Sequence, residues 1–319
     1  MSSSVTNKTD PLISVILCTR NRADLLKIAL DSLVAQAYPR DDFEVVVVDN
    51  ASTDHTPQVI ASYDSLGIMR YVHEPNIGLC VARNTGWQSA RGRLIAYFDD
   101  DAIAEQGWLA AVEAAFAANP SDLGVVGGRV QPMWEGPRPE WLADDIAYSL
   151  TIVDWGEERK FITDLSREWL VGANMAMPKH VLAEVGGFHP WLDRVGTNLL
   201  SSGDVYLQKE IVKRGYRCMY WPEMAIQHLV TTARLEPRSF LRRYYWQGVS
   251  DAVMLLIEQT PSPAERIDIA VARGKRLYGR TARISWPLAT PKNKDAFADA
   301  CFALSDTGFV AGLLGAAGH

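Results

Sequence analysis

The stretch Leu94-Ile95-Ala96-Tyr97-Phe98-Asp99-Asp100-Asp101-Ala102 decides how the rest of the chain is interpreted. A short apolar run of strand type ends here in three consecutive carboxylates, which repel one another. A divalent cation with phosphate ligands would stabilise such a cluster, because Mg²⁺ and Mn²⁺ prefer oxygen ligands and take one or two carboxylates together with phosphates and water. The alternative is a solvated acidic turn that begins a helix. The triplet by itself leaves both interpretations open.

The bulk composition is that of an ordinary globular protein. The chain has 319 residues, of which 48% are hydrophobic and 22% charged, with a net charge of −6, which argues against a general nucleic-acid binder. The four cysteines are scattered without C-x-x-C spacing, as expected for reduced thiols rather than a zinc site or disulfides. Residues 1–10 are polar and lack an apolar signal core, and the apolar run 309–317 is too short to span a bilayer. We therefore expect a cytoplasmic protein with a disordered tail over residues 1–10.

Strand-like runs alternate with helical patterns through the first hundred residues. The predicted strands are 12–18, 43–48, 69–72 and 94–98, and the predicted helices begin near 24, 54 and 81. This alternation with short connections predicts an α/β fold with a parallel sheet.

Polar clusters directly follow three of these strands, at residues 19–22, 49–54 and 99–101. Ligands of open parallel sheets bind outside the carboxyl ends of the strands, so the three clusters should meet at one edge. No G-x-G-x-x-G or G-x-x-x-x-G-K-[ST] follows the first strand, which argues against a dinucleotide fingerprint and a P-loop.

The rest of the chain predicts further elements and a boundary. The proline- and tryptophan-rich stretch 133–167 is expected to be an irregular lid or wall of a site. The predicted strands are 124–130, 169–177, 217–221 and 224–228, and the predicted helices are 106–118, 179–185 and 204–214, followed by helices from 237 to the end. We expect a catalytic domain over 11–232 and a helical region over 233–319.

Several motifs in this order resemble family 2 glycosyltransferases. They are Ile13-Ser-Val-Ile-Leu-Cys-Thr-Arg-Asn-Arg22, Val47-Val-Asp-Asn-Ala-Ser-Thr-Asp54, Asn76-x-Gly-x-x-x-Ala-Arg-Asn-x-Gly86, the acidic triplet, Gly172-Ala-Asn-Met175, Gly186-Gly-Phe188 and Gly203-Asp204. The resemblance implies a GT-A fold (a mostly parallel sheet flanked by helices), a nucleotide-diphosphate sugar donor, Mn²⁺ or Mg²⁺, and transfer with inversion. Residues 196–204 and 242–252 also resemble the HpsE-type polysaccharide-biosynthesis subgroup.

The resemblance implies roles for individual residues at the sheet edge. Asp101 would bind the metal, Asp99 would bind the ribose, and Asp100 would support either role. The full set implied for the nucleotide is Thr19, Arg22, Asp49, Asn50, Asp99 and Asp100. Many relatives have Asp in place of Asn50, so the nucleobase of the donor is less certain. The alternative roles are a solvated charge for Arg22 and turn or cap chemistry for 49–54.

Inversion needs a base that takes a proton from the acceptor hydroxyl, and we assign this role to Asp204. The competing interpretation is a helix capping box, because Ser201-x-x-Asp204 has the required spacing. The family usually has Glu-Asp here, and this chain has Gly203 at the Glu position.

Two further side chains have open roles. His228 is predicted to follow a strand, where it is either a structural residue or a ligand that completes the metal site, suited to Mn²⁺ more than Mg²⁺. Arg83 either meets the diphosphate or anchors its helix to the sheet.

A basic stripe marks the C-terminal helices, formed by Arg273, Arg276, Arg280 and Arg283. It is either a solvated face or a contact with anionic head groups of a membrane, or with the diphosphate of a lipid-linked acceptor. The aromatic residues nearby, Phe240, Tyr244, Tyr245 and Trp246, are expected to pack this region onto the catalytic domain or to line a sugar cleft.

The sequence therefore predicts a metal-dependent glycosyltransferase that acts on a saccharide or lipid-linked saccharide. Two alternatives stay open. One is a sugar nucleotidyltransferase, although the Gly-rich basic loop usual after its first strand is absent. The other is a catalytically inert nucleotide-sugar binding module.

Overall fold

The structure is a computed structural model that describes residues 10–119, 121–192, 194–195, 198–281 and 291–315. The predicted tail therefore lies outside the described residues except for Asp10, as do Gly196, Thr197 and Arg283 of the motifs above.

An eight-stranded sheet forms the centre of the protein, in the order β3-β2-β1-β4-β9-β6-β10-β8. Four strands, β1 (Ile13–Thr19), β2 (Phe43–Asp49), β3 (Met69–His73) and β4 (Leu94–Asp99), are parallel to one another. Strand β9 (Asn174–Pro178) runs antiparallel between β4 and β6 (Leu123–Gly127). At the far edge, β10 (Arg217–Tyr220) is parallel to β6, and β8 (Lys160–Ile162) is antiparallel to β10. The predicted α/β class with a mostly parallel sheet is confirmed.

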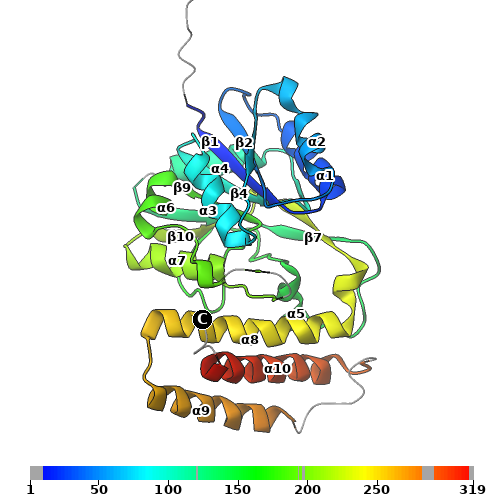
Figure 1. The fold of residues 1–319 in the computed structure, drawn as a ribbon, viewed down its shortest axis with the longest axis vertical. Coiled ribbons are helices and arrows are strands. Elements are labelled where there is room, and N and C mark those ends of the chain that lie inside the picture. The colour runs from blue at the N-terminus through cyan, green and yellow to red at the C-terminus, as the bar shows by residue number, and fades with distance from the viewer. Residues whose placement is uncertain (1–9, 120, 193, 196–197, 282–290, 316–319) are drawn as a thin grey trace, which may run out of the picture.

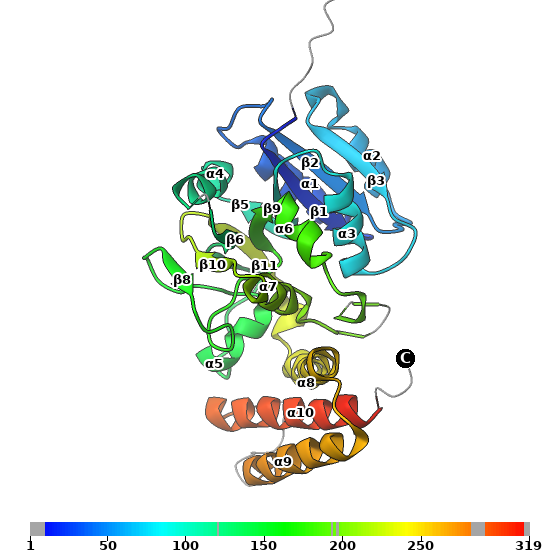
Figure 2. The same cartoon turned by 90° about the vertical axis from the view of Figure 1, so that its left-hand side faces the viewer.

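Helices cover the sheet because its central strands are apolar on both faces. Strand β2 is buried along its whole length. The helices of this part are α1 (Ala23–Val34), α2 (Thr56–Ala61), α3 (Leu79–Ser89), α4 (Trp108–Ala118), α6 (Lys179–Val185) and α7 (Gly203–Lys213), with short 3₁₀ turns η1 (Asp64–Leu66) and η3 (Pro190–Leu192). In α1 the apolar stripe predicted from the sequence is buried, as at Leu26 and Leu30. Figures 1 and 2 show these layers above the C-terminal helices.

A second, three-stranded sheet in the order β5-β11-β7 corrects two sequence predictions. The predicted strand 124–130 is two strands, β6 and β7 (Val130–Trp134), that belong to different sheets. Gly128 lies between them, where an added Cβ would stand 1.9 Å from the Met224 carbonyl oxygen. Strand β11 (Ile226–Val230) continues past His228, which lies mid-strand opposite Ala102 of β5 (Ala102–Ala104). This pairing brings His228 next to the acidic triplet.

Residues 133–167 contain more regular structure than expected. They include α5 (Asp144–Ala147), η2 (Tyr148–Leu150) and β8. The predicted strand 169–177 begins only at Asn174, because the preceding residues form a loop.

The C-terminal region is a layer of three helices, α8 (Pro237–Gln259), α9 (Pro263–Thr281) and α10 (Lys294–Gly315), reached through η4 (Thr232–Leu235). Helix α8 lies against the catalytic part and α10 packs against both α8 and α9, as Figures 1 and 2 show. By length and composition α10 could cross a membrane, but 56% of its apolar window is buried inside the protein.

Glycines allow α8 and α10 to approach closely. A Cβ at Gly248 would stand 1.8 Å from the Ser305 carbonyl oxygen, and one at Gly308 would stand 1.9 Å from the Tyr245 carbonyl oxygen. The two backbones therefore touch at this crossing, which leaves no room for a methyl group.

The basic stripe of α9 faces α10 and is an ion-pair cluster. Arg273 and Arg276 lie 2.8 and 2.7 Å from the Asp306 carboxylate, and Arg280 lies 3.2 Å from Asp299. The Asp306 side chain is only 4% exposed. These three guanidinium groups are therefore paired within the helical layer, although the Arg276 side chain stays half exposed. Contact of the stripe with a membrane or with a lipid-linked acceptor stays a prediction.

Candidate active site

A large cavity lies between the carboxyl edge of the main sheet and helix α8. Its volume is about 1710 Å³, more than the roughly 1,000 Å³ of a large single-ligand pocket, so it has room for two substrates. Most residues singled out in the sequence line it, namely Thr19, Arg22, Asn50, Arg83, Asp99, Asp100, Asp101, Gly203, Asp204 and His228. Within the described ranges Asp49 is not among the lining residues. The wall formed by 133–167 contributes Tyr148 and Trp155.

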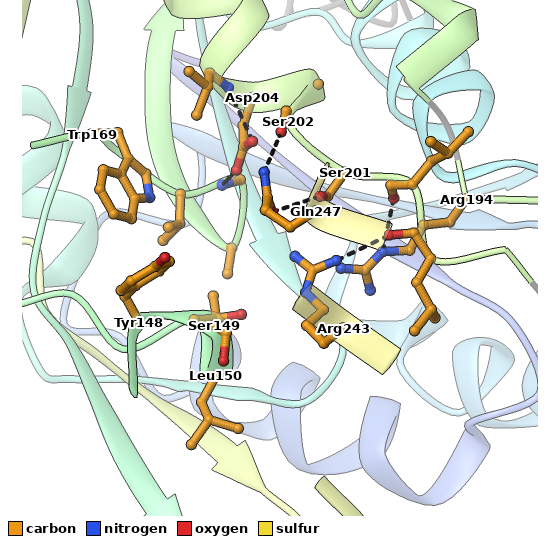
Figure 3. Close-up of a pocket in the computed structure, with 18 of the residues that line it drawn as sticks. Tyr148, Ser149, Leu150, Trp169, Arg194, Ser201, Ser202, Asp204, Arg243 and Gln247 are labelled. Atoms are coloured by element: carbon orange, nitrogen blue, oxygen red, sulfur yellow. Dashed lines mark hydrogen bonds between the residues drawn. The ribbon is translucent and has the colours of Figure 1, made fainter. Parts of the chain in front are cut away.

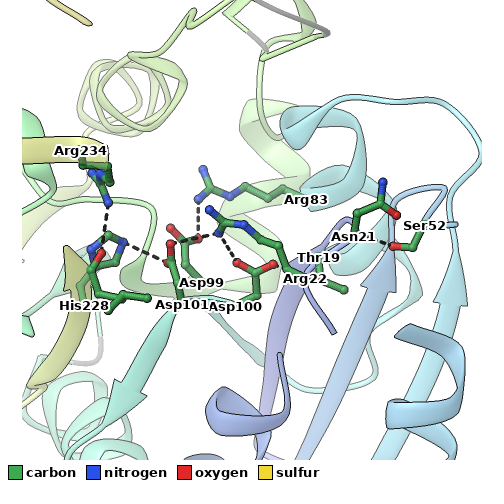
Figure 4. A network of polar contacts seen from close by, with 11 residues as sticks. Thr19, Asn21, Arg22, Ser52, Arg83, Asp99, Asp100, Asp101, His228 and Arg234 are labelled. Carbon is green, nitrogen blue, oxygen red and sulfur yellow. Dashed lines mark hydrogen bonds and ion pairs between the residues drawn. The ribbon is translucent and has the colours of Figure 1, made fainter. Parts of the chain in front are cut away.

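Asp100 turns inward and connects the first and fourth strands. Its carboxylate accepts a 2.7 Å hydrogen bond from the Thr19 hydroxyl and a 2.8 Å bond from Arg22 (Figure 4). Burial raises the pKa of Asp100 to about 6, against the opposing effect of Arg22. These two hydrogen bonds hold the carboxyl ends of β1 and β4 together.

Asp101 faces His228. The Nε2 atom of His228 lies 3.1 Å from Oδ1 of Asp101, and Arg22 donates to Oδ2 at 3.0 Å. Burial opposes ionisation, but the hydrogen bond and charge of His228, with Arg22 and Arg234, hold the pKa of Asp101 well below its usual range. Asp101 is therefore an ionised carboxylate in the cavity.

Asp99, Asp101 and His228 could hold a metal ion together. One ligand atom from each lies within 4.8 Å of the others. Two carboxylates and an imidazole suit Mn²⁺, and the same carboxylate oxygens suit Mg²⁺. The structure adds Asp99 to this group, a residue that the sequence assigned to the ribose.

Asn50 has a structural use that explains why an amide stands there. Its Nδ2 atom donates to the carbonyl oxygens of Glu74 and Asn76 at 3.2 and 2.7 Å, and its Oδ1 atom accepts the Gly78 N–H at 2.9 Å. An ionised Asp could not make the two donations. Asn50 therefore holds the loop before α3 in place.

Asp49 is also engaged by neighbours. It accepts a 3.0 Å bond from the Tyr71 hydroxyl and a 2.9 Å bond from the backbone N–H of Ser52. The second bond is the turn chemistry weighed above for residues 49–54. Next to it, Ser52 accepts a hydrogen bond from the backbone N–H of Asn21 (Figure 4).

Arg83 anchors α3 to the sheet and borders the candidate metal site. It is buried, donates to Asp99 at 3.2 Å and lies 5.2 Å from the centre of the Phe188 ring. An added Cβ on Gly172 would come within 2.5 Å of the Arg83 guanidinium. Gly172 is therefore needed for this close contact.

Asp204 lies in the first turn of α7 with both carboxylate oxygens bonded to backbone (Figure 3). Oδ1 accepts the Val205 N–H and Oδ2 accepts the Gly172 N–H, each at 3.0 Å. The capping-box prediction is wrong, because Ser202 is the residue before the helix and the Ser201 hydroxyl donates instead to Gln247 of α8 at 3.0 Å.

Gly203 has little space around it. An added Cβ would stand 3.2 Å from the Cys80 sulfur and 3.4 Å from the Leu192 carbonyl oxygen. A side chain at this position would need the Cys80 sulfur to move by a few tenths of an ångström.

The sequence did not single out several polar residues of the cavity. They are Arg194 and Arg234, which come from the loop before α7 and from η4, so no local motif groups them. Arg243, Gln247 and Asp251 join them from the quoted 242–252 motif, in which no role was given to these residues. Two of the aromatic residues, Phe240 and Tyr244, pack against Trp141 and Tyr148 as expected.

Comparisons with known proteins identify related sequences. The model of "Glycosyl transferase family 2" matches residues 14–186. A glucosyl-dolichyl phosphate glucuronosyltransferase of Haloferax volcanii is 26% identical over 77% of this chain and 78% of that protein. A validoxylamine A glucosyltransferase of Streptomyces hygroscopicus is 31% identical over 56% of this chain and 47% of that protein.

Solved structures share the fold. The mannosyltransferase PcManGT of Pyrobaculum calidifontis, in complex with GDP-Man and Mn²⁺, has a TM-score of 0.61 and 21% identity over 95% of this chain and 87% of that one. TarS residues 1–349 of S. aureus, in complex with UDP-GlcNAc, has a TM-score of 0.54 and 20% identity over 79% of this chain and 68% of that one. The narrower HpsE-type resemblance stays a prediction. The family model covers more than half of the chain, including the acidic triplet. This protein is therefore a member of glycosyl transferase family 2.

Proposed function

We propose that this glycosyltransferase is metal-dependent and inverting, and that it transfers a sugar from a nucleotide-diphosphate sugar to a hydroxyl group of a saccharide or lipid-linked saccharide. One observation carries the proposal: the Asp99–Asp101–His228 group and the Asp204 carboxylate line the same cavity. The relatives support the substrate classes, since the structures similar to this chain hold GDP-Man with Mn²⁺ or UDP-GlcNAc. The Haloferax relative is named for a lipid-linked glucosyl phosphate.

The donor would bind at the carboxyl edge of β1, β2 and β4. Thr19 and Arg22 hold Asp100 and Asp101 in place there, and Asn50 fixes the loop before α3. A divalent cation held by Asp99, Asp101 and His228 would supply positive charge opposite the departing diphosphate. Arg83 keeps Asp99 in position through their ion pair. We propose that Asp99 thereby takes part in the metal site rather than only in ribose binding.

Asp204 would act as the base. The Gly172 and Val205 N–H groups fix its carboxylate at the start of α7, and the acceptor hydroxyl would give its proton to that carboxylate as it attacks the anomeric carbon. Proton removal and attack on the face opposite the leaving group give inversion. The helix dipole favours the negative charge of Asp204.

The two proposed domains would bind different substrates. The catalytic domain over 11–232 would bind the donor, and the helical region over 233–319 would supply one wall of the acceptor space through α8, which carries Arg243, Gln247 and Asp251.

The test is hydrolysis or transfer from a panel of UDP- and GDP-sugars by the pure protein with Mn²⁺. We expect slow release of the nucleoside diphosphate with one donor, and loss of this release in Asp101→Ala. Donor binding without turnover, across the donor panel and a set of saccharide acceptors, would instead favour an inert binding module.

A further inference from the structure

Three arginine side chains line the cavity that also holds the candidate metal site and Asp204. They are Arg194, Arg234 and Arg243, which we call the arginine group. They come from the loop before α7, from η4 and from α8, three segments that meet only in the folded protein.

The guanidinium groups of Arg194 and Arg243 are neighbours. Arg243 Nη1 donates to the Leu199 carbonyl oxygen at 3.1 Å, and Arg194 Nε donates to the Leu200 carbonyl oxygen at 3.3 Å. These two acceptors belong to consecutive residues, and Figure 3 shows the two guanidinium groups side by side near Gln247. Gln247 in turn donates to the Ser202 hydroxyl at 2.9 Å, just before α7 and Asp204.

Arg234 stands on the metal side of this pair. Its Nη1 atom donates to the Leu229 carbonyl oxygen at 3.4 Å, next to His228 (Figure 4). Its charge contributes to the low pKa of Asp101.

The arginine group has no carboxylate ion pair within the described residues, in contrast to Arg22 and Arg83 in the same cavity. Arg194 is exposed to the cavity, and Arg234 and Arg243 are half-buried. Desolvation lowers the pKa of Arg194, against the opposing charges of Asp99 and Asp204. Burial, followed by the charges of Arg194 and Arg234, lowers the pKa of Arg243 to about 9. Asp204 acts in the opposite direction and does not offset them.

Two acids of α8 line this side of the cavity, Glu258, which pairs with Lys209 at 3.1 Å, and Asp251. Asp251 accepts a hydrogen bond from Gln247 at 2.9 Å, and burial raises its pKa to about 6, although Lys209 and Arg243 oppose this effect. Asp251 therefore lies close enough to act on the charge of Arg243, but the two side chains form no ion pair. The arginine group therefore presents positive charge to the cavity without a carboxylate ion pair among the described residues, and such an arrangement favours an anionic ligand.

We propose that the arginine group binds a phosphate group carried by the acceptor, in a subsite separate from that of the donor diphosphate. This inference rests on the proposed function. The pair Arg194–Arg243 lies beside the Ser202–Gln247 contact that precedes Asp204, whereas Arg234 is held next to His228 of the candidate metal group. Guanidinium groups from three segments suit the several oxygens of a phosphate better than the two of a carboxylate.

The experiment uses the full chain with Mg²⁺ and a saturating concentration of UDP or GDP, whichever raises the melting temperature more. Inorganic phosphate and acetate are titrated calorimetrically into this complex. We expect phosphate to bind in the presence of the nucleotide and more tightly than acetate. Arg243→Gln and Arg194→Gln should each weaken phosphate binding by about tenfold or more, because each removes a charge-assisted pair. Arg238→Gln, an exposed residue of the same helix outside the cavity lining, is the matched control and should leave binding unchanged.

Two outcomes would overturn the inference. In one, the nucleotide displaces phosphate and Arg243→Gln weakens nucleotide binding, which would assign the arginine group to the donor diphosphate. In the other, the wild type fails to bind phosphate at millimolar concentration, or the variants bind it as the wild type does. If Arg243→Gln does not fold, judged by circular dichroism, Arg194→Gln and the charge-keeping Arg243→Lys decide the matter. A failure of the proposed function would appear differently, as absent nucleotide-sugar turnover with phosphate binding intact.

Discussion

The Oδ2 atom of Asp204 accepts a 3.0 Å hydrogen bond from the backbone N–H of Gly172. Gly172 packs directly against the guanidinium of Arg83, and Arg83 pairs with Asp99. The candidate base and the candidate metal site are therefore connected through one glycine and one arginine, which fixes their separation across the cavity.

Replacing Asp204 by Asn tests the proposed base. Asparagine keeps an oxygen that can accept the Gly172 N–H but cannot take a proton at neutral pH. We expect the transfer rate to fall by about 10²- to 10⁴-fold, with donor affinity unchanged within about twofold. Single-turnover kinetics and donor titration measure the two quantities. A rate within about tenfold of the wild type would remove Asp204 from the base role. Asp268→Asn, at an exposed position of α9, is the control.

Replacing His228 by Gln tests the metal site. The variant loses one of the three grouped ligands, so Mn²⁺ affinity should fall by on the order of 10- to 100-fold. Electron paramagnetic resonance of free Mn²⁺ measures this directly. His180→Gln is a matched control, because His180 is exposed on α6 outside the cavity. Equal Mn²⁺ affinity in His228→Gln and the wild type would mean that the histidine is structural only.

Asp251 gives a pH-dependent contribution to stability. Its pKa is raised by burial from 3.8 to about 6, so between these values the folded state binds more protons than the unfolded state. The free energy of unfolding should therefore decrease as pH rises through this window. Asp251→Asn should remove this decrease and make the protein more stable than the wild type by about 1–3 kcal/mol at pH 8, but not at pH 4.

Urea unfolding of both proteins at the two pH values checks the Asp251 prediction. The difference between variant and wild type isolates Asp251 from other titrating groups. A difference of the same size at pH 4 and pH 8 would contradict the assignment.

The sequence predicted the parts of the site that share one edge of the sheet. Thr19 and Asp99 each end a parallel strand, so the rule for strand ends places them together, whereas Asp49 also ends a strand but does not line the cavity. It could not place His228 correctly, because that residue reaches Asp101 through strand pairing in a second sheet. It also could not show that Arg273 and Arg276 face Asp306, since the partner is on a helix thirty or more residues later. Helical periodicity gives a face but not what covers that face.

Alanine should have opposite effects on stability at a glycine of the α8–α10 crossing and at an open glycine of α9. Gly308→Ala forces a methyl group into the backbone of α8, and overpacking of this kind costs about 1–3 kcal/mol beyond the gain in helix propensity. Gly274→Ala on α9 adds a methyl group where nothing lies within 4 Å, and should stabilise the protein by about 0.5–1 kcal/mol. Urea denaturation measures both. A stabilising Gly308→Ala would show that the two helices are not held at this distance.

Direct backbone contact at Gly248 and Gly308 fixes the position of α8 against α10, beside the cavity. Helix α8 contributes Arg243, Gln247 and Asp251 to the cavity lining, and none of the three takes part in the glycine crossing. Substitutions at these three positions would leave the glycine crossing in place, although Gln247 and Arg243 also contact the loop before α7 through Ser202 and Leu199. If α8 forms a wall of the acceptor site as proposed, acceptor preference can change through these side chains while the α8–α10 spacing stays the same.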